Sequence, residues 1–523
     1  MITPIEQQTM KKVYLRLLPF CFILYFICYL DRVNVGFAAL TMNKDLGLSS
    51  YVFGLGAGAF FWGYFILEVP SNLILDRVGA RRWIARVMVS WGLVSGAFAF
   101  INGPTSFFIL RFLLGVAEAG FFPGMILYFT YWFPPSHRSR IVAGFMAAIP
   151  VSIGLGAPIS TALLGLDGLL GIAGWRWLFL CEAAPAVIFG IITWFYLTDR
   201  PAQAGWLDAG EREWLAREME SERRTVETGR SISVLQSLFN PRVLALAAIH
   251  FGQAGVSVAI AVFAAQIIKQ LGLTNMQTGF TTAIPYVFGT IGMIVWGSYA
   301  DRKNERRWNL TASCTTMAIG CVIAGLFDNS YWAVAGLSLA TIGLYASNAH
   351  LFPLPAVFLM GPALASGIAW VNSVGILGGS ASPPIVGWLK DATGSFSSGL
   401  YALAIFALFA AVVSAIGVRE TPWRSCRERS KRPATRGGPS TALSLRLEIV
   451  LDKGLDNLVD AGVGGKAEGF GARGGERGRP AGDDALDERV GLPADPSVGL
   501  VAAGAANRGR HLADSDRKPR KLQ

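Results

Sequence analysis

Two full charges lie side by side inside the first long hydrophobic run of the sequence, where Asp31 precedes Arg32 in YFICYLDRVNVGF. A charged side chain near the centre of a bilayer costs about 2.5–3.5 kcal/mol on insertion scales, so such residues usually face a polar cavity. Neighbouring residues on a helix point about 100° apart, so the two charges need not pair with each other. Either both residues lie at the membrane surface with Arg32 extended toward water, or they bind a charged substrate or ion within the membrane.

A third buried charge is expected in the run RFLLGVAEAGFFPGMILYF, which carries Arg111 and Glu118. Their seven-residue spacing places the two side chains on one helix face. A carboxyl group in mid-membrane either pairs with a buried polar or basic group or takes up a proton. We therefore predict Glu118 as the first candidate for proton coupling and Asp31 as the second. The alternative is a permanent buried ion pair of Glu118 with Arg32 or Arg111.

Further polar side chains occur at similar depths. Tyr25, Tyr29 and Arg32 share one helix face, and Tyr64 and Glu68 lie one helical turn apart in the second run. For Glu68 we predict hydrogen bonds between helices. The second half of the sequence offers amides, hydroxyls and imidazoles, namely His250, Gln253, Asn348, His350, Asn372 and Ser373. This division suits an anion held by Arg32, with carboxyl groups nearby for protons and the second half against its uncharged part.

Long hydrophobic helices must position these residues. The chain has 523 residues, of which 52% are hydrophobic and only 15% are charged, and its mean hydropathy is +0.44. Runs of about 20 apolar residues are each long enough to cross the roughly 30 Å hydrocarbon layer. We predict an all-α polytopic membrane protein with about twelve spans, which begin near Val13, Tyr51, Trp83, Thr105, Ile141, Trp175, Val243, Gln277, Trp308, Tyr331, Ala363 and Ser398.

The basic residues are concentrated in short loops after alternate spans. By the positive-inside rule, we predict that both termini and the central loop are cytoplasmic, in a multi-pass protein of the bacterial inner membrane. These loops account for much of the net charge of +11, so we expect membrane lipid around the protein and no nucleic-acid partner. No nucleophile–base pair, phosphate loop or metal-ligand cluster is visible in the sequence. We therefore predict no enzyme activity, no cofactor and no metal.

An internal repeat divides the spans into two sets. LDRVGARRW (75–83) ends the second span and ADRKNERRW (300–308) ends the eighth, and both read D-R-x-x-x-R-R-W. Matching loops at matching positions predict two six-helix bundles related by an axis along the membrane normal. We predict that these loops control the change of conformation through Asp76, Arg77, Arg81, Arg82, Asp301, Arg302, Arg306 and Arg307.

The predicted organisation has four parts: an N-terminal bundle at 1–198, a cytoplasmic central loop at 199–241, a C-terminal bundle at 242–421 and a tail at 422–523. The central loop mixes charges of both signs in DAGEREWLAREMESERR, which favours a short amphipathic helix. The tail is rich in Gly, Arg, Ala and Asp and has no span-length apolar run, so we predict that it is disordered. Its composition is also typical of out-of-frame translation of GC-rich DNA, and the sequence leaves both origins open.

The paired loops and the arrangement of spans resemble the major facilitator superfamily. From Met10 to about Pro422 the chain is similar to its anion:cation symporter branch, in stretches that include YLDRVNVGFAAL, EVPSNLILDRVGARRWIAR, RFLLGVAEAGFFPG and GWLKDATGSF. Within that branch it looks most like the tartrate permeases, in MNKDLGLS, GFMAAIPVS and LLGLDGLLGIAGWRWLF. Permeases for hydroxyphenylacetate, phthalate and sugar acids are near relatives.

The resemblance implies a role for each matching residue. Arg32 would bind the substrate carboxylate, Asp31 and Glu118 would be the proton-linked acids, and Tyr29, Tyr64 and Asn372 would face the substrate. The chain departs from the family pattern at Phe352, where tryptophan is common, and at Ile376, where asparagine is common. Both positions belong to the second half, so they bear on the identity of the ligand more than on its class.

These observations predict a monomeric secondary active transporter that imports a small organic anion with protons, such as the dicarboxylate tartrate. An aromatic acid or a sugar acid is the alternative substrate. A drug or metabolite exporter is a rival of the same class, and it predicts lipophilic cargo and transport that survives loss of Arg32. A non-transporting membrane sensor is a rival of another class. The sequence leaves open the particular anion, sodium instead of proton coupling, the stoichiometry, and import as against exchange.

Overall fold

The computed structural model describes residues 4–228, 236, 238–303, 305–359 and 361–418. The predicted disordered tail at 422–523 lies outside these residues, and so does part of the predicted central loop. The described residues form helices and connecting turns, with no strand among them. The prediction of an all-α protein is therefore confirmed.

The first half contains eight α-helices within the described residues. They are α1 (Pro4–Asp45), α2 (Ser50–Val78), α3 (Ala80–Ala97), α4 (Pro104–Glu118), α5 (Phe121–Trp132), α6 (Pro135–Met146), α7 (Ala148–Leu164) and α8 (Gly174–Tyr196). Two predicted spans are each built from two helices, α4 with α5 over Pro104–Trp132 and α6 with α7 over Ser136–Leu164. Glu118 is the last residue of α4, so it lies near the middle of its span as predicted.

The central segment and the second half contribute the remaining described helices. They are α9 (Ala209–Thr228), α11 (Pro241–Lys269), α12 (Asn275–Lys303), α13 (Arg307–Leu326), α14 (Tyr331–Leu351), α15 (Pro355–Phe358), α16 (Gly361–Thr393) and α17 (Ser397–Gly417). Helix α9 confirms the predicted short helix between the halves.

Ten segments of the described chain are long and apolar enough to cross a membrane. The predicted spans at α14 and α16 are not among them, although these helices have 21 and 33 residues. At 1.5 Å per residue, both exceed the roughly 30 Å thickness of the hydrocarbon layer. Both carry polar groups, such as Asn348 in α14 and Asn372 in α16, which lower their mean hydropathy.

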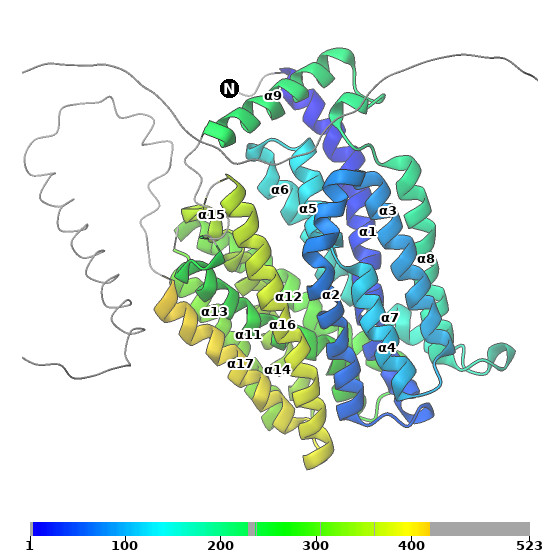
Figure 1. The fold of residues 1–523 in the computed structure, drawn as a ribbon. Coiled ribbons are helices and arrows are strands. Elements are labelled where there is room, and N and C mark those ends of the chain that lie inside the picture. The colour runs from blue at the N-terminus through cyan, green and yellow to red at the C-terminus, as the bar shows by residue number, and fades with distance from the viewer. Residues whose placement is uncertain (1–3, 229–235, 237, 304, 360, 419–523) are drawn as a thin grey trace, which may run out of the picture. The chain divides into compact units, whose positions relative to one another are not determined.

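In the described part of the chain, three helix pairs form the main contacts between the two halves. Helix α2 runs beside α16 (Figure 1), α7 packs on α12, and α1 packs on α11. At the end of the structure where α2 begins, Asp391 of α16 accepts hydrogen bonds from the backbone N–H groups of Ser50 (3.1 Å) and Tyr51 (2.8 Å). A carboxylate at a helix N-terminus satisfies free N–H groups and complements the helix dipole. The described residues lie in one compact unit, so the division at 199–241 stays a prediction.

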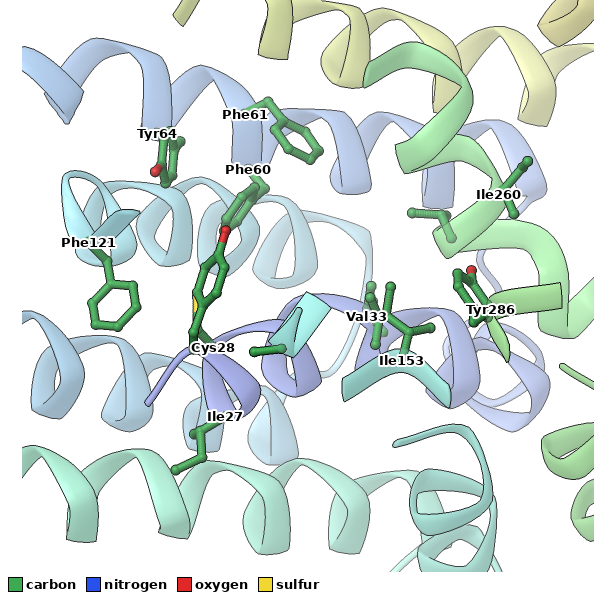
Figure 2. Close-up of a cluster of buried hydrophobic side chains, with 14 of the residues drawn as sticks. Ile27, Cys28, Val33, Phe60, Phe61, Tyr64, Phe121, Ile153, Ile260 and Tyr286 are labelled. Atoms are coloured by element: carbon green, nitrogen blue, oxygen red, sulfur yellow. The ribbon is translucent and has the colours of Figure 1, made fainter. Parts of the chain in front are cut away.

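Apolar side chains from both halves fill the space around the helix crossings. Figure 2 shows Val33 of α1 beside Ile153 of α7, with Ile260 and Tyr286 of the second half nearby. All four belong to one cluster of buried residues. Aliphatic and aromatic contacts of this kind, together with small residues, hold membrane helices together where the hydrophobic effect between them is weak.

Two glycines let α4 approach α2 closely enough to place Glu118. A Cβ atom on Gly115 would lie 1.9 Å from the carbonyl oxygen of Phe60, so no larger residue fits there. Gly120 has a φ angle of 86°, and a Cβ atom there would lie 2.1 Å from the hydroxyl of Ser71. Left-handed backbone favours glycine, and this turn ends α4 directly after Glu118.

Candidate functional site

A cavity of about 130 Å³ is lined by helices of both halves. The first half contributes side chains of α1, α2, α4, α5, α6 and α7, and the second half contributes side chains of α11, α14 and α16, with Phe352 following α14. Its polar and aromatic lining residues include Tyr25, Tyr29, Arg32, Tyr64, Arg111, His250, Gln253, Tyr345, Asn348, Phe352 and Asn372. Concave sites with a few convergent polar groups are typical of small-molecule binding.

Arg32 is part of the cavity wall, and 15% of its side-chain surface remains exposed. Its guanidinium forms an ion pair with Glu118. Three aromatic rings surround the same group, with centroids 5.0 Å (Tyr29), 5.3 Å (Phe60) and 5.4 Å (Tyr64) from its central carbon. Aromatic faces stabilise a cation by their quadrupole. The cation is thus held inside the protein, and the membrane-surface interpretation of Arg32 does not describe this structure.

Glu118 is 1% exposed and lies behind Arg32. Besides the ion pair, its Oε1 atom accepts a hydrogen bond from the thiol of Cys28 at 3.2 Å. The structure therefore contains the buried ion pair that the sequence suggested as the alternative for this residue. Removal of one partner of such a pair leaves an uncompensated buried charge, which is strongly unfavourable.

Asp31 points away from the cavity into the first half. Its carboxylate accepts hydrogen bonds from the indole of Trp91 and the hydroxyl of Ser95, both at 2.9 Å, and from the amide of Asn34 at 3.4 Å. It is 1% exposed and is not among the lining residues. The helical turn between neighbouring residues thus puts Asp31 and Arg32 in different surroundings, and the structure does not bring Asp31 to the cavity.

Tyr29, Tyr64 and Asn372 line the cavity, as the resemblance implied for residues that face a substrate. Asn372 also contacts the first half, because its side-chain amide donates to Glu68 at 2.8 Å. Ser373 donates to the same carboxylate. The interhelical hydrogen bonds predicted for Glu68 are therefore present, and they connect α2 with α16.

Sequence reasoning missed the place of Arg111 in this site. Its side chain is 2% exposed, lines the cavity, and lies 5.4 Å from the ring of Phe60. The seven-residue spacing from Glu118 was the signal, but it suggested Arg111 only as one of two possible partners for Glu118. The positions of Gln253 and His250 in the wall were also not predicted, because the sequence does not show which polar side chains of different helices face the same cavity.

The basic loop after α2 contacts the first residue of the predicted central loop, and the one after α12 contacts the last helix of the second half. The backbone N–H of Arg81 donates to Asp199 at 2.8 Å, and the Nε atom of Arg307 donates to the carbonyl of Ala415 at 3.0 Å. Arg77 and Arg82 are exposed. The side chains of Asp76, Asp301 and Arg302 lie outside the described ones. A role for these loops in the change of conformation stays a prediction.

The sequence of the chain matches the family model of the Major Facilitator Superfamily over residues 21–363. The chain belongs to the Major Facilitator Superfamily. A putative tartrate transporter of Agrobacterium vitis is 50% identical to this chain over 422 residues, which cover 81% of this chain and 97% of the relative. A quinolone resistance transporter of Acinetobacter baumannii is 39% identical over 412 residues, which cover 79% and 95%.

Solved structures support the major facilitator fold. A D-xylose–proton symporter has a TM-score of 0.64 at 15% identity and covers 79% of this chain and 99% of its own. A bacterial homolog of the lysosomal transporter Spinster, in an inward-facing conformation, has a TM-score of 0.62 at 16% identity. Together with the relatives, this makes the protein a multi-pass membrane transporter of the secondary type with a small-molecule substrate.

Proposed function

We propose that this major facilitator protein couples protons to the import of a small organic dianion such as tartrate. The single observation that carries the proposal is the charge of the cavity: Arg32 and Arg111 are two cations in its wall, and among the described residues Glu118 forms an ion pair with Arg32 while no carboxylate forms one with Arg111. The ion pair compensates Arg32 and leaves the positive charge of Arg111 in the wall, in surroundings of low dielectric constant where an anion is favoured. Guanidinium groups also match the geometry of carboxylates.

The size of the cavity supports a small substrate. Pockets for drug-sized ligands measure roughly 300–1,000 Å³, whereas this cavity measures about 130 Å³. The relatives named as putative tartrate transporters, at 50% identity, point to the same class of substrate. An aromatic acid or a sugar acid is the alternative within this class, because Phe352 and Ile376 both line the second-half wall.

Proton coupling follows from competition for one guanidinium. Glu118 occupies Arg32 in the present structure. A proton on Glu118 removes its charge and releases Arg32 for the substrate carboxylate, so proton and anion bind together and each increases the affinity for the other. Alternating access of the two halves would then carry both across the membrane. Asp31, on the other side of α1, is the second candidate for a proton-linked acid.

The experiment is uptake of labelled tartrate into proteoliposomes with and without an inward proton gradient. We expect the wild-type protein to accumulate tartrate only with the gradient. E118Q should lose accumulation but retain exchange of internal for external tartrate, because the neutral amide mimics the protonated acid. D31N is the matched comparison, and it shows whether the second acid also carries protons. Accumulation that persists in E118Q would exclude Glu118 as the coupling group.

Export of a drug-like molecule is the second candidate, and the 39% identical quinolone resistance transporter is the observation that favours it. It predicts a lipophilic substrate and transport that is unaffected by loss of Arg32. Uptake of a labelled fluoroquinolone into the same proteoliposomes, with R32A as the variant, separates the two functions.

The predicted location is the bacterial inner membrane with both termini in the cytoplasm.

A further inference from the structure

Glu68 is a buried carboxylate that the proposed transport cycle does not use. It is 2% exposed and belongs to α2 of the first half. Both of its oxygens accept hydrogen bonds from α16 of the second half: Oε1 from the side-chain amide of Asn372 at 2.8 Å, and Oε2 from the hydroxyl of Ser373. Hydrogen bonds between helices can serve packing alone, but one of these donors also lines the cavity.

The contact with Glu68 determines which end of the Asn372 amide faces the cavity. Both oxygens of Glu68 act as acceptors in the structure, and an acceptor can bind only the NH₂ end of an amide. The Nδ2 atom of Asn372 is therefore turned toward Glu68. Because the two ends of the amide diverge from the same carbon, the Oδ1 carbonyl is left as the group that Asn372 can present to a substrate.

We propose that Glu68 is a positioning residue that makes Asn372 a hydroxyl acceptor, so that the site selects a hydroxylated dicarboxylate over its deoxy counterpart. This inference rests on the proposed function. The arginines of the first half bind carboxylates and do not distinguish tartrate from succinate, since both are dianions of four carbons. A carbonyl in the opposite wall does distinguish them, because only a substrate hydroxyl can donate to it. A site built to bind a hydroxyl rejects the analogue that lacks it, since its own polar group is then left unpaired.

The test measures how well unlabelled tartrate and succinate compete for uptake of labelled tartrate. We expect wild-type protein to prefer tartrate by about tenfold to a hundredfold, the range that one unpaired buried group produces. E68Q should bring the two competitors to within about threefold, because the glutamine can accept from or donate to Asn372 and no longer decides which end of the amide faces the cavity. N372A should show the same loss of preference.

Two control variants separate positioning from packing. S373A removes the other hydrogen bond to Glu68 but leaves the one from Asn372, so we expect it to keep the wild-type preference even if transport slows. E68D retains a carboxylate acceptor on a side chain that is one CH₂ shorter, so it should keep more of the preference than E68Q. A purely structural contact predicts instead that E68Q and S373A both lower the rate and both leave the ratio unchanged. Size-exclusion profiles in detergent identify variants that do not fold.

Each outcome bears on one of the two proposals. An unchanged ratio in E68Q overturns the positioning role, and if E68Q does not fold, an unchanged ratio in N372A overturns it. Wild-type protein that takes up both acids equally well also overturns it, while the transport of dicarboxylates stands. Wild-type protein that transports neither acid overturns the proposed function itself.

Discussion

The two walls of the cavity differ in their chemistry. The wall from the first half contains ionic groups, with Arg32 and Arg111 lining the cavity and Glu118 paired with Arg32. The wall from the second half contains amides, an imidazole and aromatic rings, among them Gln253 and Asn372. Under the proposed function, one half would bind the charge of the substrate and the other would distinguish its uncharged part. Changes to the two walls should therefore have different consequences.

The largest effect is expected from R32A. It removes the guanidinium that we propose as the binding group for a substrate carboxylate, and it leaves Glu118 buried without its cation, which costs about 3–5 kcal/mol in comparable buried pairs. We expect tartrate uptake to be lost and the melting temperature in detergent to fall by several degrees. R32K retains the positive charge but lacks the planar set of N–H donors of a guanidinium. It should therefore keep part of the stability but little of the tartrate uptake. Tartrate uptake by R32A near the wild-type level would show that the ionic wall does not bind the anion.

A smaller and more selective effect is expected from R111Q. If Arg111 binds the second carboxylate of the substrate, its loss should lower the affinity for a dianion by about tenfold to a hundredfold. This is the range for one charge-assisted hydrogen bond. The affinity for a monocarboxylate of similar size, such as glycerate, should change by less than about threefold. Inhibition of labelled tartrate uptake by the two acids measures both effects. An equal loss of affinity for glycerate and for tartrate would contradict a separate site for the second carboxylate.

The smallest effect is expected from Q253L in the uncharged wall. Gln253 is 1% exposed, lines the cavity, and donates to the sulfur of Cys314 at 3.8 Å, which is a weak contact. Its replacement should raise the KM for tartrate by about threefold to tenfold through loss of one neutral hydrogen bond. The dependence of uptake on the proton gradient should not change. A Q253L protein that no longer responds to the gradient would break the division between the walls, because coupling would then also involve the second half.

Much of the fold could be predicted from the sequence, because the bilayer restricts what a spanning segment can be. A span needs about 20 apolar residues, and this requirement located helices at each predicted position. The break at Glu118 was not predicted, although Gly120 follows it closely. A glycine inside an apolar run is common in membrane helices, so it marks a turn only when the neighbouring helix is known.

The candidate site was predicted in part. Full charges in a membrane segment are costly, and this cost alone pointed to Arg32 and Glu118. The same argument applied equally to Asp31, which the structure places among Trp91 and Ser95 instead of in the cavity. Hydropathy assigns a similar cost to both adjacent charges, Asp31 and Arg32. Their side chains point about 100° apart on the helix, so they contact different residues.

The sequence by itself determined that this chain spans a membrane, that its loops repeat, and that certain charges must be compensated, because these follow from the cost of transfer into hydrocarbon. Only the tertiary structure decided which groups compensate them. Arg32 meets Glu118 across 86 positions of the chain, and Glu68 meets Asn372 across 304. Such pairs depend on the rotation and spacing of whole helices, which are set by packing contacts that no local pattern contains.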